Sequence, residues 1–271
     1  MIETFRNAWR VPELRKKLLF TFFIIIIYRV GGTVPVPYLD SVALSAWFEQ
    51  SASSGDFFSY LNVLSGGNFS KATLLALSVS PYINAQIIIQ LLTYALPPLE
   101  RLQKEGPEGR KKLNKITKYA SLAIAIFQAW AYYLTMKKAG ACVYTEGFSK
   151  IFAEIVIIAC FTAGASLTIW LGDEINEKGI GNGISMLLFA GIIARGPSAV
   201  IGLFDYMKTG EAKNIILVIA ILVVFVLMIG FIIFMNEAER RIPIQYAKRV
   251  VGRKQYGGQN TFIPIKIAMS G

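Results

Sequence analysis

The chain has 271 residues, of which 54% are apolar, with a mean hydropathy of +0.51 and a formal net charge of +11. This apolar content, with the charges gathered between long apolar runs, excludes an ordinary soluble domain. We therefore predict an all-α, polytopic membrane protein in which residues 1–271 form a single membrane domain with no soluble domain attached.

Six apolar runs have the length of a membrane span, and the basic residues between them are distributed unevenly. The runs lie near residues 18–37, 74–96, 117–136, 151–171, 183–203 and 214–235. With the amino terminus in the cytoplasm, the inner segments 1–17, 97–116, 172–182 and 236–262 carry 5, 6, 1 and 6 Lys and Arg residues. The outer segments 38–73, 137–150 and 204–213 carry 1, 3 and 2. The positive-inside rule favours this orientation, which explains most of the net charge better than nucleic-acid binding does.

The second apolar region is interrupted, because the run stops at Ser65-Gly66-Gly67 and then resumes. The first piece, Phe57–Leu64, would form a helix of about 12 Å, too short for a hydrocarbon core of about 30 Å. The second piece, Leu74–Leu96, is long enough to span. It also contains several polar residues, namely Ser78, Ser80, Asn84, Gln86 and Gln90. Since polar groups are costly in lipid, these side chains are expected to face a neighbouring helix or a water-filled interior.

One face of this second piece combines apolar and amide side chains. On an ideal helix Val79, Ile83, Gln86, Ile87 and Gln90 fall within about 100° of one another. Two interpretations remain open, namely ordinary helix–helix packing and the lining of a wet cavity. The Ser80-Pro81 pair and the short helix upstream favour the cavity. The short helix would then act as a removable stopper, and the apolar residues as a collar that excludes water.

The sequence lacks residues that many enzyme sites need. It contains no His, so it cannot form a Ser-His-Asp or Cys-His arrangement or an H-E-x-x-H metal motif. The run from Gly179 to Ser185 fails the dinucleotide and P-loop patterns, and predicts a tight turn with Asn182 as a helix N-cap. Cys142 and Cys160 lie at different predicted depths, so no disulfide is expected. We expect a protein that is not an enzyme and that holds no metal or cofactor.

Few charged residues fall inside the predicted spans, and they are Arg29, Lys118, Glu154 and Arg195. Lys118 sits at an inner edge and the others in outer halves, so interfacial snorkelling explains them better than an ion relay. Coupled transport is thus not supported by these charges. A small-solute secondary transporter with inverted repeats and a broken helix remains the alternative function.

Several short motifs, in their order and spacing, are similar to those of the SecY family, the central subunits of the bacterial protein-conducting channel. The match extends from the first span to the last residue. The motifs are Pro35-Val36-Pro37, Ser65-Gly66-Gly67, Pro81-Tyr82-Ile83-Asn84-Ala85-Gln86-Ile87-Ile88-Ile89-Gln90-Leu91-Leu92, Gly179-Ile180-Gly181-Asn182-Gly183-Ile184-Ser185 and Tyr246-Ala247-Lys248-Arg249.

The resemblance implies a helical bundle that forms the N-terminal half and the sixth span of a ten-span channel. In the family, two inverted five-span halves open like a clamshell. Unfolded secretory polypeptides cross the pore, and membrane helices leave it laterally into lipid. The implied segments are a first half (1–203), a hinge loop (204–213), the sixth span (214–235), a basic cytoplasmic loop (236–262) and the start of a seventh span (263–271).

The resemblance also assigns roles to individual residues. The implied pore ring includes Val79, Ile83 and Leu188. The implied lateral gate includes Asn84, Ile87 and Gln90. The implied plug covers about residues 57–67 and consists of Phe57, Phe58, Tyr60, Leu61, Asn62, Leu64, Ser65, Gly66 and Gly67.

The basic cytoplasmic loop carries more charge than membrane orientation needs. In the family this loop docks the ribosome or the SecA motor ATPase, with Arg253 and Lys254 at its exposed tip. Its basic residues are Arg240, Arg241, Lys248, Arg249, Arg253 and Lys254. The resemblance further implies SecE-like and SecG-like small membrane subunits, signal sequences and membrane lipids as partners. It places the protein in the bacterial plasma membrane, with energy supplied by SecA and ATP, the proton-motive force or the translating ribosome.

The chain departs from the family pattern at its carboxyl end. It ends at Gly271, where the resemblance places the start of a seventh span. The second half of the lateral gate, the remaining ring positions and a second basic loop would lie in the four spans that follow in the family. We therefore expect a truncated gene or a partial chain rather than a functional half-channel.

Overall fold

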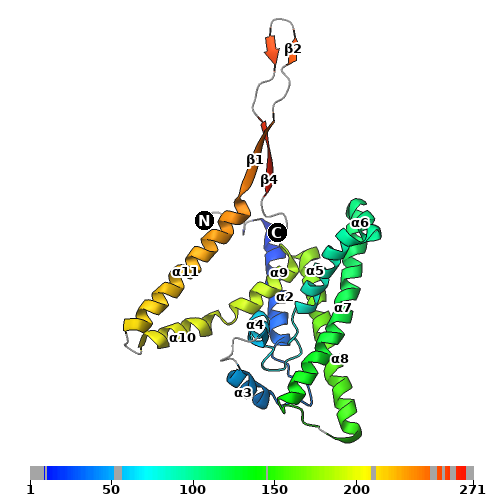
Figure 1. Ribbon diagram of the computed structural model, residues 1–271, viewed down its shortest axis with the longest axis vertical. Coiled ribbons are helices and arrows are strands. Elements are labelled where there is room, and N and C mark those ends of the chain that lie inside the picture. Colours follow the sequence, from blue (N-terminus) through cyan, green and yellow to red (C-terminus); the bar gives the residue numbers. More distant parts are fainter. Residues whose placement is uncertain are drawn as a thin grey trace. The chain divides into compact units, whose positions relative to one another are not determined.

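The computed structural model describes residues 9, 11–51, 57–144, 146–208, 212–244, 249–251, 254–256 and 261–266. The chain divides into two compact units, Met1–Pro197 and Ser198–Gly271. Most of the described elements are helices (Figure 1).

The first unit is a set of packed helices. In chain order they are α2 (Pro12–Gly31), α3 (Ser41–Ser51), α4 (Phe57–Leu64), α5 (Ser80–Ala95), α6 (Pro97–Lys104), α7 (Pro107–Lys138), α8 (Gly147–Lys178) and α9 (Gly183–Ile193). α5 packs on α7, and α7 packs on α8 (Figure 1). A proline lies in the first turn of α2, α5, α6 and α7. Its fixed φ and missing N–H suit that position, so these prolines define where the helices begin.

The core of this unit depends on aromatic stacking and on small residues. The ring of Phe69 stacks on that of Tyr132, with centroids 4.1 Å apart, and Tyr132 lies 5.0 Å from Phe161. A Cβ atom added to Gly164 would lie 1.8 Å from the carbonyl oxygen of Leu74. Glycine at this position therefore allows α8 to pack directly against the backbone that precedes α5.

Two local predictions are confirmed residue by residue. The short helix predicted for Phe57–Leu64 is α4, with those bounds. Asn182 is the N-cap of α9, and its side chain accepts hydrogen bonds from the backbone N–H groups of Ile184 and Ser185. Both cysteines are free, as expected, and burial raises the pKa of the Cys142 thiol above its ordinary value.

The prediction of a continuous span over Leu74–Leu96 is wrong in its first part. Residues 74–79 form buried turns, and the helix begins only at Ser80, so that α5 has 16 residues. The backbone N–H of Leu74 donates to the carbonyl of Val34 at 2.8 Å, and Ser78 has a φ of 50°. Because a buried apolar turn and a helix share the same composition, the hydrophobic pattern could not separate them.

The predicted fifth span and hinge also differ from the structure. The helix is interrupted at Ala194 and Arg195, between α9 and α10 (Gly196–Lys208). The predicted hinge loop, 204–213, is therefore helical up to Lys208, and residues 209–211 lie outside the described part of the chain. The Arg195-Gly196-Pro197 sequence explains the interruption, since glycine and proline both disfavour a helix interior.

The second unit contains α11 (Ala212–Glu237) and two small antiparallel ribbons. β1 (Glu239–Ile244) pairs with β4 (Thr261–Lys266), and β2 (Arg249–Val251) pairs with β3 (Lys254–Tyr256). The predicted basic loop 236–262 is thus partly a β-ribbon. The predicted start of a seventh span at residue 263 is wrong for residues 263–266, which belong to β4. The continuous apolar run of this strand, Phe262-Ile263-Pro264-Ile265, resembles the start of a span but pairs with β1.

Three described helical stretches are long and apolar enough to cross a membrane: Gly147–Lys178, Gly183–Lys208 and Lys213–Glu237. Of the six spans expected from the sequence, the other three do not coincide with a described helix that is both long and apolar enough. Among these, α5 has only 16 residues, or about 24 Å, and α2 contains Glu13 and several basic residues near its start.

The hydroxyl of Tyr132 is predicted to stabilise the fold by donating to the buried carbonyl of Phe69. Replacing Tyr132 with Phe keeps the ring stack but leaves that carbonyl without its partner, at a cost of roughly 1–3 kcal/mol. Unfolding of the chain in detergent micelles should show this loss of free energy. Tyr119→Phe on the same helix, at a side chain that is 76% exposed, is the control and should change nothing. Equal stabilities for both variants would contradict the role of the hydroxyl.

Candidate functional site

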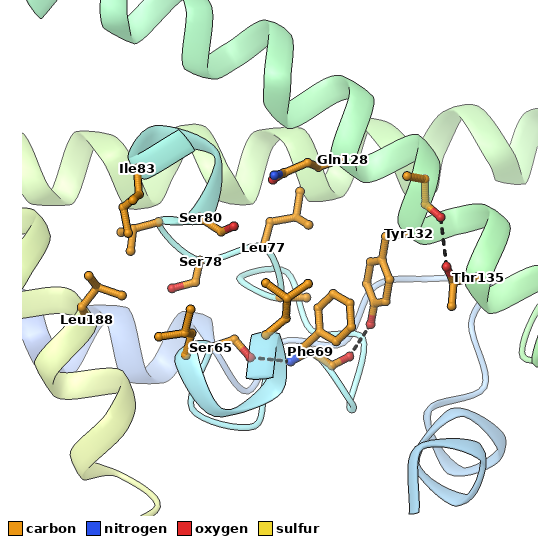
Figure 2. A pocket seen from close by; sticks show the side chains of 15 residues that line it. Ser65, Phe69, Leu77, Ser78, Ser80, Ile83, Gln128, Tyr132, Thr135 and Leu188 are labelled. Atoms are coloured by element: carbon orange, nitrogen blue, oxygen red, sulfur yellow. Dashed lines mark hydrogen bonds between the residues drawn. The ribbon is translucent and has the colours of Figure 1, made fainter. Parts of the chain in front are cut away.

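A cavity of about 290 Å³ lies within the first unit, between the end of α4, the segment that leads into α5, and helices α7 and α9 (Figure 2). Its wall is mostly apolar. The lining residues are Leu61, Leu64, Ser65, Phe69, Ala76, Leu77, Ser78, Val79, Ser80, Ile83, Gln128, Ala131, Tyr132, Thr135 and Leu188. The lining residues extend from Leu61 to Leu188 in the sequence, so the cavity forms only when the chain folds.

All three residues predicted for the pore ring line this one cavity. Val79 is fully buried and is the N-cap residue of α5, while Ile83 follows in the first turn of that helix. Leu188 reaches the cavity from α9, and Figure 2 shows it with Ile83 at one end of the space. Ile83 and Leu188 are half-buried. The side chains therefore face an interior space.

The carboxyl end of the predicted plug is a self-capped turn. Ser65 Oγ donates to the carbonyl of Asn62 and accepts from the N–H of Phe69 at 3.0 Å. The side-chain oxygen of Asn62 accepts from the N–H of Ser70, also at 3.0 Å. Of the predicted plug residues, Leu61, Leu64 and Ser65 line the cavity. Phe57, Phe58 and Tyr60 belong to α4, but their side chains lie outside the described part of the structure.

The turn after α4 touches α9 through two glycines. Gly66 has a φ of 69°, and a Cβ atom added to it would lie 2.6 Å from the carbonyl oxygen of Gly191. Any side chain at Gly66 would therefore be strained and would collide with the backbone of α9. Gly67 has a φ of 90°, but a Cβ atom there would meet only the side chain of Arg195, at 3.5 Å. The contact of the short helix with α9 thus depends on Gly66.

The predicted gate residues do not line the cavity. Asn84, Ile87 and Gln90 are exposed on α5, beyond the turn that carries Ile83. Gln86, which the sequence placed on the same face, is also exposed. The face predicted from the helical period is therefore divided, with Val79 and Ile83 at the cavity and the amide residues on an open surface of the first unit.

The predicted docking residues belong to the second unit. Arg240 and Arg241 lie in β1, opposite Ile265 and Pro264, and the guanidinium of Arg241 sits 4.7 Å from the centre of the Phe262 ring. Arg249 and Lys254 begin β2 and β3, where only the backbone is described. Lys248 and Arg253 lie outside the described residues.

Arg29 and Lys118, which the sequence predicted to snorkel, have specific partners within the first unit. Arg29 donates from Nη2 to the carbonyl oxygens of Ala190, at 2.5 Å, and Gly191, at 3.2 Å. Lys118 pairs with Asp173 at 2.6 Å, which joins α7 to α8. A charge within an apolar run was the available signal, but the partners are 161 and 55 residues away, so the sequence alone could not identify them.

Sequence reasoning also missed polar residues near the cavity. Tyr28, which is fully buried, shares a hydrogen bond of 2.9 Å between its hydroxyl and Ser78 Oγ. In the described part of the chain, Oε1 of Gln128 is buried without a hydrogen-bond partner. Gln128 is polar within the apolar run of α7, which is the signal that would have drawn attention to it.

Comparison with known proteins agrees with this fold. A family model described as SecY matches residues 73–271. The protein translocase subunits SecY of Streptomyces coelicolor and Aquifex aeolicus are each 40% identical to the chain over 281 and 277 residues. Each alignment covers 100% of this chain and 63% of the relative. The chain therefore spans less than two thirds of the length of these relatives.

Two solved structures share the fold. One, described as a protein conducting channel, has a TM-score of 0.60 and 20% sequence identity, covering 93% of this chain and 52% of that chain. The other is Sec61 in the canine ribosome-channel complex, with a TM-score of 0.56 and 20% identity, covering 85% and 49%. The chain is thus a mostly helical, polytopic membrane protein with the fold of protein-conducting channels. It belongs to the SecY family.

Gly66→Ala is predicted to release the short helix from α9. The substitution introduces a strained backbone and a collision with the Gly191 carbonyl. Gly140→Ala is a matched control, because Gly140 has the same φ of 69° but no atom of the described residues lies within 4 Å of an added Cβ atom. The reporter is a Ser65→Cys thiol, at a side chain that is 1% exposed, in a background without the two native cysteines.

Maleimide labelling of this thiol should become several-fold faster with Gly66→Ala and stay unchanged with Gly140→Ala. Equally slow labelling of both variants would show that α9 tolerates a side chain at Gly66, contrary to this account.

Proposed function

We propose that this protein is the central pore-forming subunit of a Sec translocon, which passes unfolded secretory polypeptides across the plasma membrane and releases membrane helices laterally into lipid. One observation carries the proposal: Val79 and Ile83 at the start of α5 and Leu188 on α9 line one apolar cavity against which the short helix α4 ends. Family membership and the channel fold support it.

The chemistry of this constriction suits a seal that does not select among peptide sequences. Branched apolar side chains offer a passing chain no hydrogen bonds, and a narrow apolar passage excludes water and ions by dewetting. Val79, Ile83 and Leu188 form the part of the pore ring contributed by this chain. The segment 57–67 is the plug, held against α9 by the contact of Gly66 with Gly191. A solved structure described as having a plug domain that stabilises the closed state has the same fold, with a TM-score of 0.60.

The exposed face of α5 is the proposed lateral gate. Asn84, Ile87 and Gln90 lie on it, outside the cavity. In this arrangement a signal sequence or membrane helix contacts amide and isoleucine side chains as it passes from the pore to lipid.

The two β-ribbons of the second unit, which carry the basic residues, are the proposed docking element for the ribosome or the SecA motor ATPase. Arg240, Arg241, Arg249 and Lys254 lie on its strands, and Lys248 and Arg253 belong to the same stretch of sequence. SecE-like and SecG-like subunits complete the assembly. The energy for transport comes from SecA with ATP, the proton-motive force or the translating ribosome. The distribution of Lys and Arg supports a cytoplasmic amino terminus, and the bacterial relatives support a plasma-membrane location.

The proposed division of the chain changes slightly from the sequence-based one. The first half ends near the interruption at Ala194 and Arg195, the hinge includes α10 and residues 209–211, and α11 is the sixth span. The cytoplasmic element keeps residues 236–262 and extends to Lys266, because β4 pairs with β1 up to that residue.

Reconstitution tests this function directly. The chain, joined to the part of the Streptomyces coelicolor relative that lies outside the 63% covered by the alignment, would be inserted in vesicles with SecE-like and SecG-like subunits, SecA, ATP and a secretory preprotein. Protection of the preprotein from added protease is the expected result. Saturable uptake of a small solute without any protected preprotein would favour a secondary transporter and contradict the proposal.

Ile83→Asn is predicted to loosen the seal of this completed channel. An amide at the constriction hydrogen-bonds water, so the resting ion leak should rise several-fold and preproteins with defective signal sequences should be exported. Ile83→Leu keeps the apolar volume and serves as one control. Ile88→Asn, on the same helix at an exposed position that does not line the cavity, is the second. If Ile83→Asn leaked no more than Ile88→Asn, Ile83 would not belong to the constriction.

A further inference from the structure

We propose that Tyr28 and Arg29, at the carboxyl end of α2, are a positioning pair that holds the two walls of the constriction at a fixed separation. This inference rests on the proposed function, in which Val79 and Ile83 form one wall and Leu188 the other. The two residues are adjacent in sequence, yet they bind opposite walls.

Tyr28 fixes the wall that carries Val79 and Ile83. Its side chain is fully buried, and its hydroxyl shares a 2.9 Å hydrogen bond with Ser78 Oγ. Ser78 has a φ of 50°, a left-handed conformation that is costly for a residue with a side chain. It directly precedes Val79, so the direction in which the chain enters α5 is set at this residue. The hydrogen bond between the two hydroxyls holds Ser78 in that conformation.

Arg29 fixes the wall that carries Leu188. It donates to the carbonyl oxygens of Ala190 and Gly191, in the last turn of α9. The backbone N–H of Arg195 bonds to Ile192 rather than to Gly191, so within α9 the Gly191 carbonyl lacks the usual partner four residues on. A guanidinium at this end of the helix supplies the missing donor and also interacts favourably with the helix dipole. The position at which α9 ends is therefore coupled to α2.

The turn after α4, which ends the proposed plug, contacts α9 at the same carbonyl group. The Gly191 carbonyl oxygen that accepts from Arg29 is also the atom that a Cβ added to Gly66 would meet first, at 2.6 Å, and the Tyr28 hydroxyl lies 3.9 Å from a Cβ atom added to Gly191. The end of α2 thus contacts both walls of the constriction and lies beside the plug contact. A change in α2 would reach both walls directly through these hydrogen bonds, and the plug contact through the Gly191 carbonyl that the two share. Tyr28 also packs in one apolar cluster with Val79 and Leu187, so the walls and α2 are joined by apolar packing as well.

Ordinary helix packing is the competing explanation, and it makes a different prediction. If the two side chains only stabilise the fold, removing them lowers stability but leaves the separation of the walls unchanged in the folded protein. If they position the walls, the separation changes in molecules that remain folded.

Spin labels at Gln86 and Ile192 would measure the separation. Both are exposed, on α5 and α9, and neither lines the cavity. In lipid nanodiscs, with both native cysteines replaced, the parent chain should give one narrow distance distribution. Arg29→Gln and Tyr28→Phe should broaden it and shift its mean by about 1–2 Å, the size of helix shifts at packed interfaces. Arg29→Lys, which keeps a donor and the charge, should restore part of the narrow distribution.

Arg15→Gln is the control, since it removes one positive charge from an exposed position on α2. Its distance distribution should equal that of the parent. Unchanged distributions in both Arg29→Gln and Tyr28→Phe would overturn the proposal, whatever their melting temperatures.

Ion leak in the completed channel then distinguishes this inference from the proposed function. A changed distance with a raised leak supports both. A changed distance with no leak and no translocation supports the positioning pair and contradicts the channel.

Discussion

The close approach of Gly66 to Gly191 is the constraint on which the arrangement of the site depends. α4 has 8 residues and cannot cross a membrane, so its place is set by what its carboxyl end contacts. Without a side chain at Gly66, the backbone of the following turn reaches the carbonyl of Gly191, and α4 ends against the helix that carries Leu188. The cavity between α4, α5, α7 and α9 exists because these two backbones can meet.

The character of the cavity follows from what surrounds it. Apolar side chains provide most of its wall, while the polar groups nearest to it are largely occupied in holding backbone turns: Ser65 binds Asn62 and Phe69, and Tyr132 binds Phe69. Such a site has little to offer a reaction that needs proton transfer or charge stabilisation. It suits a passage that must close against water when empty and adapt to varied side chains when filled.

The sequence correctly predicted those elements whose structure depends on residues close by in the chain. The break at Ser65-Gly66-Gly67 located α4, and Asn182 located the start of α9, because glycines and caps act on their immediate neighbours. The helix predicted for residues 74–79 was wrong for the opposite reason. Their conformation depends on Val34 and Tyr28, which are distant in sequence, and their apolar composition resembles that of a helix. The β-ribbon was missed because its strands pair across a stretch dominated by basic and turn residues.

The sequence predicted part of the candidate site as well. Val79, Ile83 and Leu188 came from a resemblance, and the fold brings them to one cavity, whereas the helical period grouped Gln86 and Gln90 with them incorrectly. The partners of Arg29 could not be found from sequence because a hydrogen bond to a backbone carbonyl leaves no trace in the identity of the accepting residues, here Ala190 and Gly191.

The most direct test of the central claim is to ask which side chains touch a polypeptide in transit. A photoreactive residue would be placed at Ile83 or Leu188 in the completed channel, and at the exposed neighbours Ile88 and Phe189 for comparison, with a secretory chain arrested during passage. The account predicts crosslinks to the arrested chain from Ile83 and Leu188 and few or none from Ile88 and Phe189. Crosslinks confined to Ile88 and Phe189 would contradict it, because the chain would then pass outside the cavity.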